Sequence, residues 1–120
     1  MSSAINLESK LALFNETWTP KIIGELNNQH VKLAKLKGEF MWHAHDDEDE
    51  LFLVLDGELT IQMRDQEIHL KSGEMYIVPK GVEHNPVSEN GASVLLFEPA
   101  MTKHTGEHIT DRTVINPERI

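Results

Sequence analysis

The centre of the chain begins with an apolar run at residues 51–55, and polar and apolar residues then alternate from Glu58 to Met63 with the period of two that is typical of half-buried β-strands. Asp56-Gly57 interrupts this pattern with a pair that favours a type I′ turn, whose two central residues need positive φ. The segment therefore predicts a tight hairpin with Leu55 opposite Glu58. In that register the inner face of the protein carries Glu50, Phe52, Val54, Leu59, Ile61 and Met63.

The opposite face of the predicted hairpin carries three leucines in succession, Leu51, Leu53 and Leu55. Monomeric proteins rarely leave such an apolar row open to water, so another segment has to cover it. A second subunit is one cover, and we expect a homodimer. The other cover is the chain's own N-terminal segment, which offers Leu11, Leu13, Phe14 and Trp18.

A second hairpin is expected around Asp65-Gln66. A short turn there aligns Met63 with Ile68 and sends His69 to the outer face. His69 is therefore interpreted as a surface histidine.

Further strands are predicted on both sides of these hairpins, at residues 21–26, 31–37, 75–78 and 92–97. Turns at Asn27-Asn28 and Asn90-Gly91 separate them from their neighbours. In the strand 31–37, Lys32 is expected on the face opposite to Val31 and Leu33. The segment 5–14 fits either a short strand or one turn of helix.

These elements predict a single all-β domain, an antiparallel barrel of jelly-roll type. The expected boundaries are an N-terminal arm over residues 1–29, the barrel over 30–99 and a C-terminal tail over 100–120 that wraps the barrel. His104 lies in that tail, and it fits a surface position better than one at the mouth of the cavity.

Composition narrows the possible partners. A chain of 120 residues suits one core, and its formal charge of −9 offers no basic stripe for nucleic acid or an anionic membrane. The absence of cysteine excludes disulfides, thiolate nucleophiles and sulfur ligands to a metal. The N-terminal residues lack the basic and apolar regions of a secretory signal, so a cytoplasmic protein is expected.

Candidate metal chemistry begins at His43 and His45, which point to the same face of an extended strand because one residue separates them. Two imidazoles on one face are half of a metal site. The acidic residues 46–49 fit a solvated loop, after which Glu50 opens the next strand. Its carboxylate is well placed as a third ligand, and His84 is suggested as a fourth.

Two stretches of the chain resemble the paired motifs of the cupin superfamily. The first motif is matched by Gly38, His43, His45, Glu50 and Gly57, and the second by Gly73, Pro79, Gly81 and His84. Two positions depart from the family pattern: Gly38 stands one residue too close to His43, and Ser88 replaces the final Asn. The resemblance implies a jelly-roll barrel in which His43, His45, Glu50 and His84 bind one divalent metal ion.

Imidazole and carboxylate ligands suit Fe, Mn, Ni, Zn or Co, and the spacing does not choose among them. Four protein ligands leave two positions of an octahedral ion for a small-molecule substrate. The side chains expected to line the substrate pocket are Phe40, Met41, Phe52, Met63, Tyr76 and Phe97.

Three functions compete for such a site. The favoured one is an isomerase or lyase that acts on a small oxygenated substrate, similar to a sugar or a hydroxy acid. A phosphorylated sugar is disfavoured because the expected interior offers no Arg or Lys to bind phosphate. The second is a non-haem iron dioxygenase, against which the oxidisable Met41 and Met63 count. The third is a non-catalytic module that binds a small ligand or metal.

Overall fold

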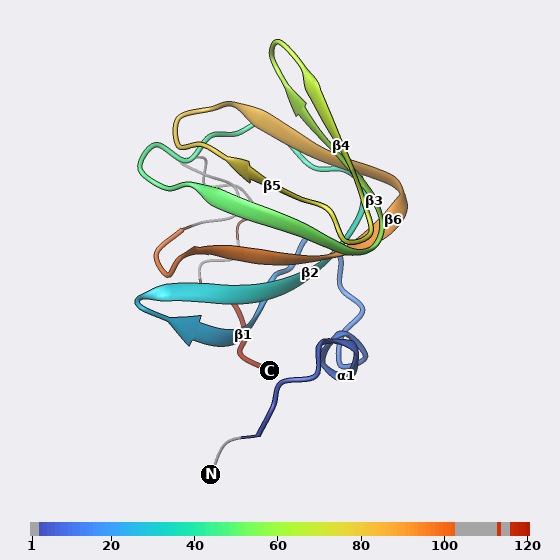
Figure 1. Ribbon diagram of the computed structural model, residues 1–120, viewed down its shortest axis with the longest axis vertical. Helices are drawn as coiled ribbons and strands as arrows, with labels where there is room; N and C mark the ends of the chain where they lie inside the picture. Colours follow the sequence, from blue (N-terminus) through green and yellow to red (C-terminus); the bar gives the residue numbers. More distant parts are fainter. Residues whose placement is uncertain (1–2, 103–112, 114–115) are drawn as a thin grey trace.

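The computed structural model describes residues 3–102, 113 and 116–120. Its elements are α1 (Leu7–Leu11), β1 (Lys21–Leu26), β2 (Gln29–Glu39), β3 (Glu50–Met63), β4 (Glu67–Lys71), β5 (Met75–Val78) and β6 (His84–Pro99) (Figure 1). The strands pair in the order β1-β2-β6-β3-β4, with β5 also paired to β3, and all these pairings are antiparallel. The predicted all-β, antiparallel, barrel-like domain is confirmed.

The predicted hairpin at Asp56-Gly57 is wrong, because β3 continues through it as one strand beside β6 (Figure 1). Gly57 and Gly91 both have positive φ, 88° and 98°, and Gly57 pairs with Ala92. The two glycines therefore lie where β3 and β6 bend together. The turn predicted at Asn90-Gly91 is likewise part of β6. Positive φ is required at both places, but it makes a bend within a strand and not a reversal of the chain.

The inner face of β3 nevertheless agrees with the prediction, since the six residues expected inside are all buried. The register of β3 against β6 shifts between Val54 and Thr60, and this irregularity moves the alternation from even to odd positions. A two-residue turn would move it in the same way. The sequence therefore predicts which residues of β3 are buried, although the hairpin that it predicts between them is wrong.

The hairpin between β3 and β4 exists, but with a register different from the predicted one. Ile61, and not Met63, pairs with Ile68. The Met63 amide donates to the Gln66 carbonyl at 2.8 Å, so the tight turn lies at Arg64-Asp65, one residue earlier than predicted. His69 is exposed on the outer face, as expected, where its Nδ1 lies 2.9 Å from Thr60 Oγ1.

Residues of β2 alternate between the interior and an outer layer formed by the N-terminal segment. Lys32 points inward with Ala34 and Leu36, whereas Leu33 packs outward against Phe14. The outer cluster is completed by half-buried residues from both ends of the chain and from the sheet: Leu7, Leu11, Val31, Leu55, Leu95 and Ile120. Helix α1 thus covers part of the outer face, and its Asn6 cap accepts a hydrogen bond from the Ser9 amide.

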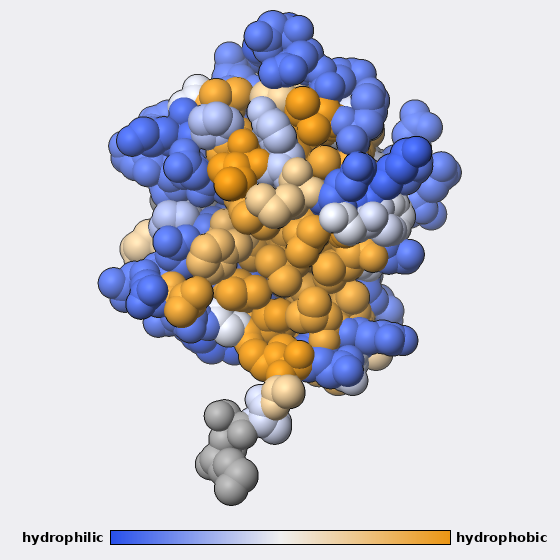
Figure 2. Space-filling view, viewed as in Figure 1, coloured by the Kyte–Doolittle hydropathy of each residue, from blue (hydrophilic) through white to orange (hydrophobic). Residues whose placement is uncertain are grey.

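The rest of that outer face stays apolar and open. Leu51 and Leu53 are half-buried there, and on the neighbouring β5 Met75 and Ile77 are 52% and 47% exposed. Figure 2 shows apolar atoms spread over the centre of one side of the molecule. The N-terminal segment therefore covers Leu55 but leaves the other two outer leucines of β3 at the surface.

The end of the chain returns to the sheet beside β1. The Ile22 amide donates to the Glu118 carbonyl at 2.8 Å, and the Ile120 amide donates to the Ile22 carbonyl at 3.0 Å. His104 and most of the expected wrapping tail lie outside the described residues. No helix among the described residues has the length and apolarity to cross a bilayer.

Candidate metal centre

Backbone pairing brings His43 and His84 together, although they are far apart in sequence. The His43 amide donates to the His84 carbonyl at 3.0 Å, and the His84 amide donates to the His43 carbonyl at 2.9 Å. Residues paired in this way project their side chains to the same face. The two imidazole centroids consequently lie 4.3 Å apart.

His45 and Glu50 are positioned by the turn that precedes β6. The Gly81 amide donates to the His45 carbonyl, and the Lys80 amide donates to Asp49 Oδ1, each at 2.8 Å. The acidic loop is therefore anchored to this turn, and Glu50 follows as the first residue of β3.

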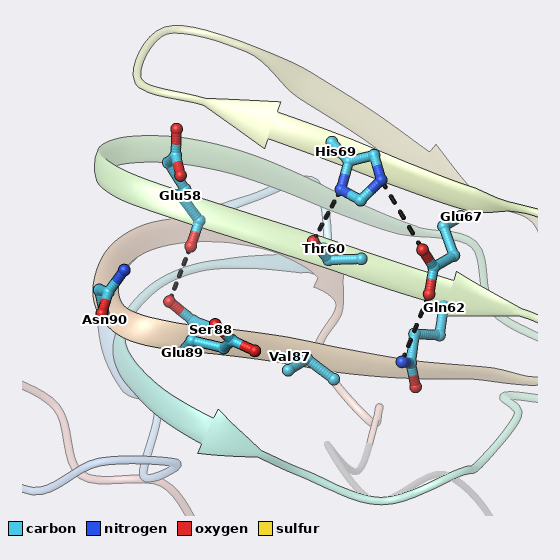
Figure 3. Close-up of a pocket in the computed structure, with 9 residues that line it drawn as sticks. All are labelled: Glu58, Thr60, Gln62, Glu67, His69, Val87, Ser88, Glu89 and Asn90. Carbon is cyan, nitrogen blue, oxygen red and sulfur yellow. Dashed lines mark hydrogen bonds and ion pairs between the residues drawn. The ribbon is translucent and has the colours of Figure 1, made fainter.

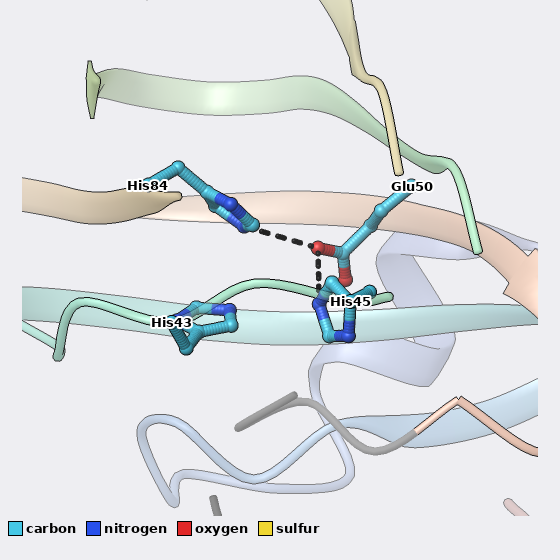
Figure 4. A group of neighbouring side chains, drawn as sticks. All are labelled: His43, His45, Glu50 and His84. Atoms are coloured by element: carbon cyan, nitrogen blue, oxygen red, sulfur yellow. Dashed lines mark ion pairs between the residues drawn. The ribbon is translucent and has the colours of Figure 1, made fainter. Parts of the chain in front are cut away.

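Four side chains then converge inside one end of the barrel (Figure 4). Glu50 Oε1 lies 3.2 Å from His45 Nε2 and 3.6 Å from His84 Nε2. One ligand atom from each of His43, His45, Glu50 and His84 can be chosen so that all lie within 4.8 Å of one another, and all four residues are buried. The structure thus brings together every residue predicted as a metal ligand.

The hydrogen bonds of two imidazoles fix which nitrogen is free to bind a cation. His43 Nδ1 lies 2.9 Å from the Met41 carbonyl, and His84 Nδ1 lies 2.9 Å from the Val82 carbonyl. A carbonyl can only accept, so Nδ1 carries the proton and Nε2 keeps its lone pair. In the neutral form of each imidazole, Nε2 is therefore the atom available as a ligand.

Burial also keeps His43 neutral. The loss of hydration, followed by the nearby imidazole of His84, lowers the pKa of His43 from 6.5 to about 4. A metal competes with protons for an imidazole, so a depressed pKa favours metal binding at neutral pH.

The carboxyl groups of Glu50 and Glu98 influence each other strongly. Burial alone would raise the pKa of Glu50, but the hydrogen bond from Glu98 and the imidazoles of His45 and His84 hold it well below its usual value. Burial, and then the negative charge of Glu50, raise the pKa of Glu98 well above its usual value. Glu50 is consequently the ionised carboxylate of this pair.

The four side chains fit a divalent cation. His84 Nε2 and Glu50 Oε1 are both buried without a hydrogen-bond partner among the described residues. Leaving such atoms unsatisfied costs about 1–3 kcal/mol each. A metal ion at the point where they converge would satisfy both, with three nitrogens and one carboxylate in its coordination shell.

A small apolar cavity lies beside this cluster and touches His43 and Glu50. It offers about 30 Å³ to a water-sized molecule, room for one or two waters. Its remaining walls are Trp18, Pro20, Ala34, Leu36, Phe40, Phe52, Pro86 and Leu96.

Of the six predicted pocket residues, only Phe40 and Phe52 line this cavity. Tyr76 pairs with Phe52 and packs on the core. Met63 is buried opposite His84, and Met41 is half-buried, but neither is among the cavity walls. Phe97 is half-buried on the outer face because the alternation of β6 turns Leu96 inward in its place, so its assignment to the pocket is corrected.

Trp18 was expected to help cover the outer leucines, but it is one of the cavity walls. Its ring stacks on Phe40 with centroids 4.7 Å apart, and its Nε1 donates to the Lys37 carbonyl at 2.9 Å. Its φ of 57° is unusual for a bulky residue. The fold of the N-terminal arm thus sets one side of the cavity.

A larger hollow of about 330 Å³ lies elsewhere, over β3, β4 and the first half of β6 (Figure 3). Its walls include exposed glutamates and His69, whose ring lies 3.7 Å from Glu67. Among its described walls, Ser88 alone is buried, and Ser88 Oγ already donates to the Glu58 carbonyl. The described part of the hollow therefore has solvated polar groups but no buried group aimed at a ligand.

Comparison with known proteins agrees with the motifs. Residues 29–98 match the family model named Cupin_2, a cupin domain. The chain belongs to the cupin family. This cupin is 48% identical to a cupin-2 domain containing protein from Shewanella frigidimarina, with a TM-score of 0.78 over 79% of this chain and 93% of that one.

Two curated proteins are also similar to this cupin. It is 42% identical to the uncharacterized protein YdbB of Bacillus subtilis over 82 residues, which cover 65% of this chain and 73% of YdbB. It is 26% identical to 3-hydroxyanthranilate 3,4-dioxygenase of Xenopus laevis over 106 residues, which cover 82% of this chain but only 37% of that enzyme.

The two departures from the family motifs lie next to each other. Gly38 pairs with Ser88 across β2 and β6, at a register shift, and its φ is 82°. Ser88 is buried, and its hydroxyl donates to the Glu58 carbonyl at 2.7 Å. Both residues thus shape the strands and take no part in the metal cluster.

Proposed function

We propose that this cupin is a metal-dependent enzyme that binds one divalent ion through His43, His45, Glu50 and His84. The supporting observation is the convergence of these four buried groups beside a cavity that reaches His43 and Glu50. A bound metal would supply Lewis-acid chemistry and open coordination positions. The protein's own part is to hold the Nε2 atoms and one carboxylate in place, and to line the small space beside the ion with apolar walls.

The walls of the cavity favour dioxygenase chemistry over the isomerase or lyase chemistry expected from sequence. A sugar or hydroxy acid needs hydrogen-bonding partners, whereas the cavity walls other than His43 and Glu50 are apolar. The oxidisable Met41 and Met63 also count less against a dioxygenase, because neither is a wall of this cavity. The similarity to 3-hydroxyanthranilate 3,4-dioxygenase supports the same choice.

Isomerase or lyase chemistry remains the second candidate, since Glu50 gives the site an ionised carboxylate next to the substrate. The interior does contain a lysine, contrary to expectation, but Lys32 is bound to Glu98 and is not a wall of the cavity. A phosphorylated substrate therefore stays disfavoured.

Metal content is the first experiment. Elemental analysis of the purified protein should give about one divalent ion per chain, and His45→Ala and His84→Ala should lower it well below one. His69→Ala is the matched control, since His69 is exposed and lies outside the cluster. Wild-type metal content in both ligand variants would mean that the site is misassigned.

Activity is the second experiment. The protein loaded with Fe(II) should consume O₂ with a hydroxylated apolar substrate that reaches the ion when the small cavity widens, and His84→Ala should not. Isomerisation or elimination of a hydroxy acid without O₂ uptake would favour the second candidate. Stoichiometric metal without either reaction would indicate the non-catalytic ligand-binding module.

A further inference from the structure

The cavity beside the metal cluster is too small for a substrate as it stands. Its space of about 30 Å³ holds one or two waters, so a larger molecule reaches the ion only if a wall moves. Several walls are strand residues, which the backbone ladders hold in place: Ala34, Leu36, Phe52, Pro86 and Leu96. Trp18 and Pro20 come instead from the arm that precedes β1. Because the proline ring is rigid, the side chain of Trp18 is the wall that can move without breaking the sheet.

The contacts of the indole and of its backbone are separate. The ring stacks on Phe40 with 13° between the two planes, and Nε1 donates to the Lys37 carbonyl at 2.9 Å. The Trp18 amide donates to the Lys35 carbonyl at 2.8 Å, which ties the arm to β2 whatever the ring does. Rotation of the side chain therefore breaks the stack and the Nε1 hydrogen bond while the backbone stays anchored.

The backbone of Trp18 is strained where it presents this ring. Its φ of 57° lies in the left-handed region, which bulky residues rarely adopt. Strain of this kind persists only where the surrounding structure holds it, and it gathers at ligand clamps and switch regions. In this conformation Trp18 packs on the inner cluster, whereas Phe14, four residues earlier, packs in the outer one. The strained residue is thus the one that turns the arm toward the cavity.

Phe40 connects the indole to the metal cluster. Its ring also contacts the imidazole of His43 in a T-shaped arrangement, with centroids 5.6 Å apart and 87° between the planes. Trp18, Phe40 and His43 all line the cavity. The indole therefore covers an aromatic face that lies next to a predicted metal ligand, and flat rings stack well on such a face.

We propose that Trp18 is the gate of this cavity and determines which substrates reach the metal. When its side chain rotates away, a flat hydroxylated aromatic molecule takes the place of the indole on Phe40 and brings its hydroxyl groups to the cluster. This inference rests on the proposed function and names its substrate class. A ligand that needs the open form binds more weakly in proportion to how rarely that form occurs, whereas a ligand that fits the closed form is unaffected.

The test compares a flat ligand with a small one on the Zn²⁺-loaded protein, by calorimetry. Tropolone is a flat ring with adjacent oxygens, and azide is close in size to the waters that the cavity holds. Trp18→Ala should bind tropolone about 10- to 100-fold more tightly than wild type, because the stack and the hydrogen bond no longer favour the closed form. Trp18→Phe keeps a ring but no N–H, so it should gain only a few-fold. Azide affinity should stay within a few-fold of wild type in both variants.

Trp42 supplies a matched control, since it is the other tryptophan of the chain and is not a wall of the cavity. Its ring lies against Arg64, with 3.9 Å from Cζ to the ring centroid. Trp42→Phe should leave the affinities for both ligands unchanged. It also leaves a single indole N–H signal in the NMR spectrum, that of Trp18. Tropolone should move this signal toward the position of a solvent-exposed indole, because the bond to Lys37 is lost, and azide should not.

The outcomes separate the gate from the metal site. Azide binding together with equal tropolone affinity in wild type and the folded Trp18 variants would overturn the gate while the metal site stands. Weaker tropolone binding in Trp18→Ala, or an equal gain for azide or in Trp42→Phe, would also overturn it. If Trp18→Ala does not fold, Trp18→Phe and the indole signal decide. Failure of the Zn²⁺-loaded protein to bind either ligand would remove the open coordination position, and with it the proposed function and this inference.

Discussion

Among single residues, His43 ties the stability of the metal-free protein to pH. Its pKa is about 4 when folded and near 6.5 when unfolded, so only the unfolded chain gains a proton between these values. The stabilisation is fully present above pH 6.5 and is lost as pH falls through 4. The loss is on the order of 3 kcal/mol, and we expect it in the free energy of unfolding measured by urea denaturation.

The variant His43→Gln isolates this effect. Glu98 acts in the opposite direction, since its raised pKa gives stability that is present below its unfolded value of about 4.5 and is lost as pH rises. We therefore compare the free energies of unfolding of wild type and His43→Gln, and expect the difference between them to change as pH falls from 6.5 to 4. Identical pH profiles for the two proteins would contradict a buried neutral His43.

The role of a residue could be predicted from sequence when it depends on neighbours within the same segment, and could not when it depends on a distant strand. The spacing of His43, His45 and Glu50 within one segment sufficed to predict three ligands. Lys32 looked like a surface residue of an alternating strand, because only pairing with β6 places Glu98 beside it. Trp18 was missed as a cavity wall for the same reason, since its position depends on how the arm packs against Phe40.

Among the elements, the bend of β3 and β6 gives a sharp stability prediction. A Cβ at Gly57 would collide with the Gly91 carbonyl oxygen and lie 2.9 Å from Ala92 Cα. Gly57→Ala should therefore lower the free energy of unfolding by several kcal/mol, more than the roughly 1 kcal/mol expected from positive φ alone. Chemical denaturation of the folded protein measures the difference.

Gly73→Ala is the matched control, because Gly73 has nearly the same φ, 86°, but no atom within 4 Å of the added Cβ. Equal losses at the two glycines would show that φ, and not the close approach of β6, makes Gly57 necessary. The close approach of β6 also explains why the hairpin predicted at Asp56-Gly57 is wrong. The sequence identifies residues that need positive φ, but whether they reverse a strand or bend it depends on the neighbouring strand.

For the whole molecule, we expect the outer sheet face to determine whether the chain assembles. Leu55 packs in the outer cluster with α1, while Leu51 and Leu53 lie beside exposed Met75 and Ile77. The sequence predicted the apolar row but not how far the arm would cover it, because coverage depends on where a short helix docks. We expect a second copy of the chain to cover the remainder, since monomers rarely expose a contiguous apolar patch of this kind.

A charge placed on either side of β3 tests that assembly. Leu53→Glu puts a carboxylate on the outer face, so the protein should elute as a monomer or with a concentration-dependent mass and should still bind metal. Val54→Glu puts the same charge at a fully buried position, where an unpaired charge costs several kcal/mol, and should abolish folding or metal binding. Size-exclusion chromatography with light scattering and metal analysis distinguishes the two. An unchanged mass for folded Leu53→Glu would mean that no second copy covers this face.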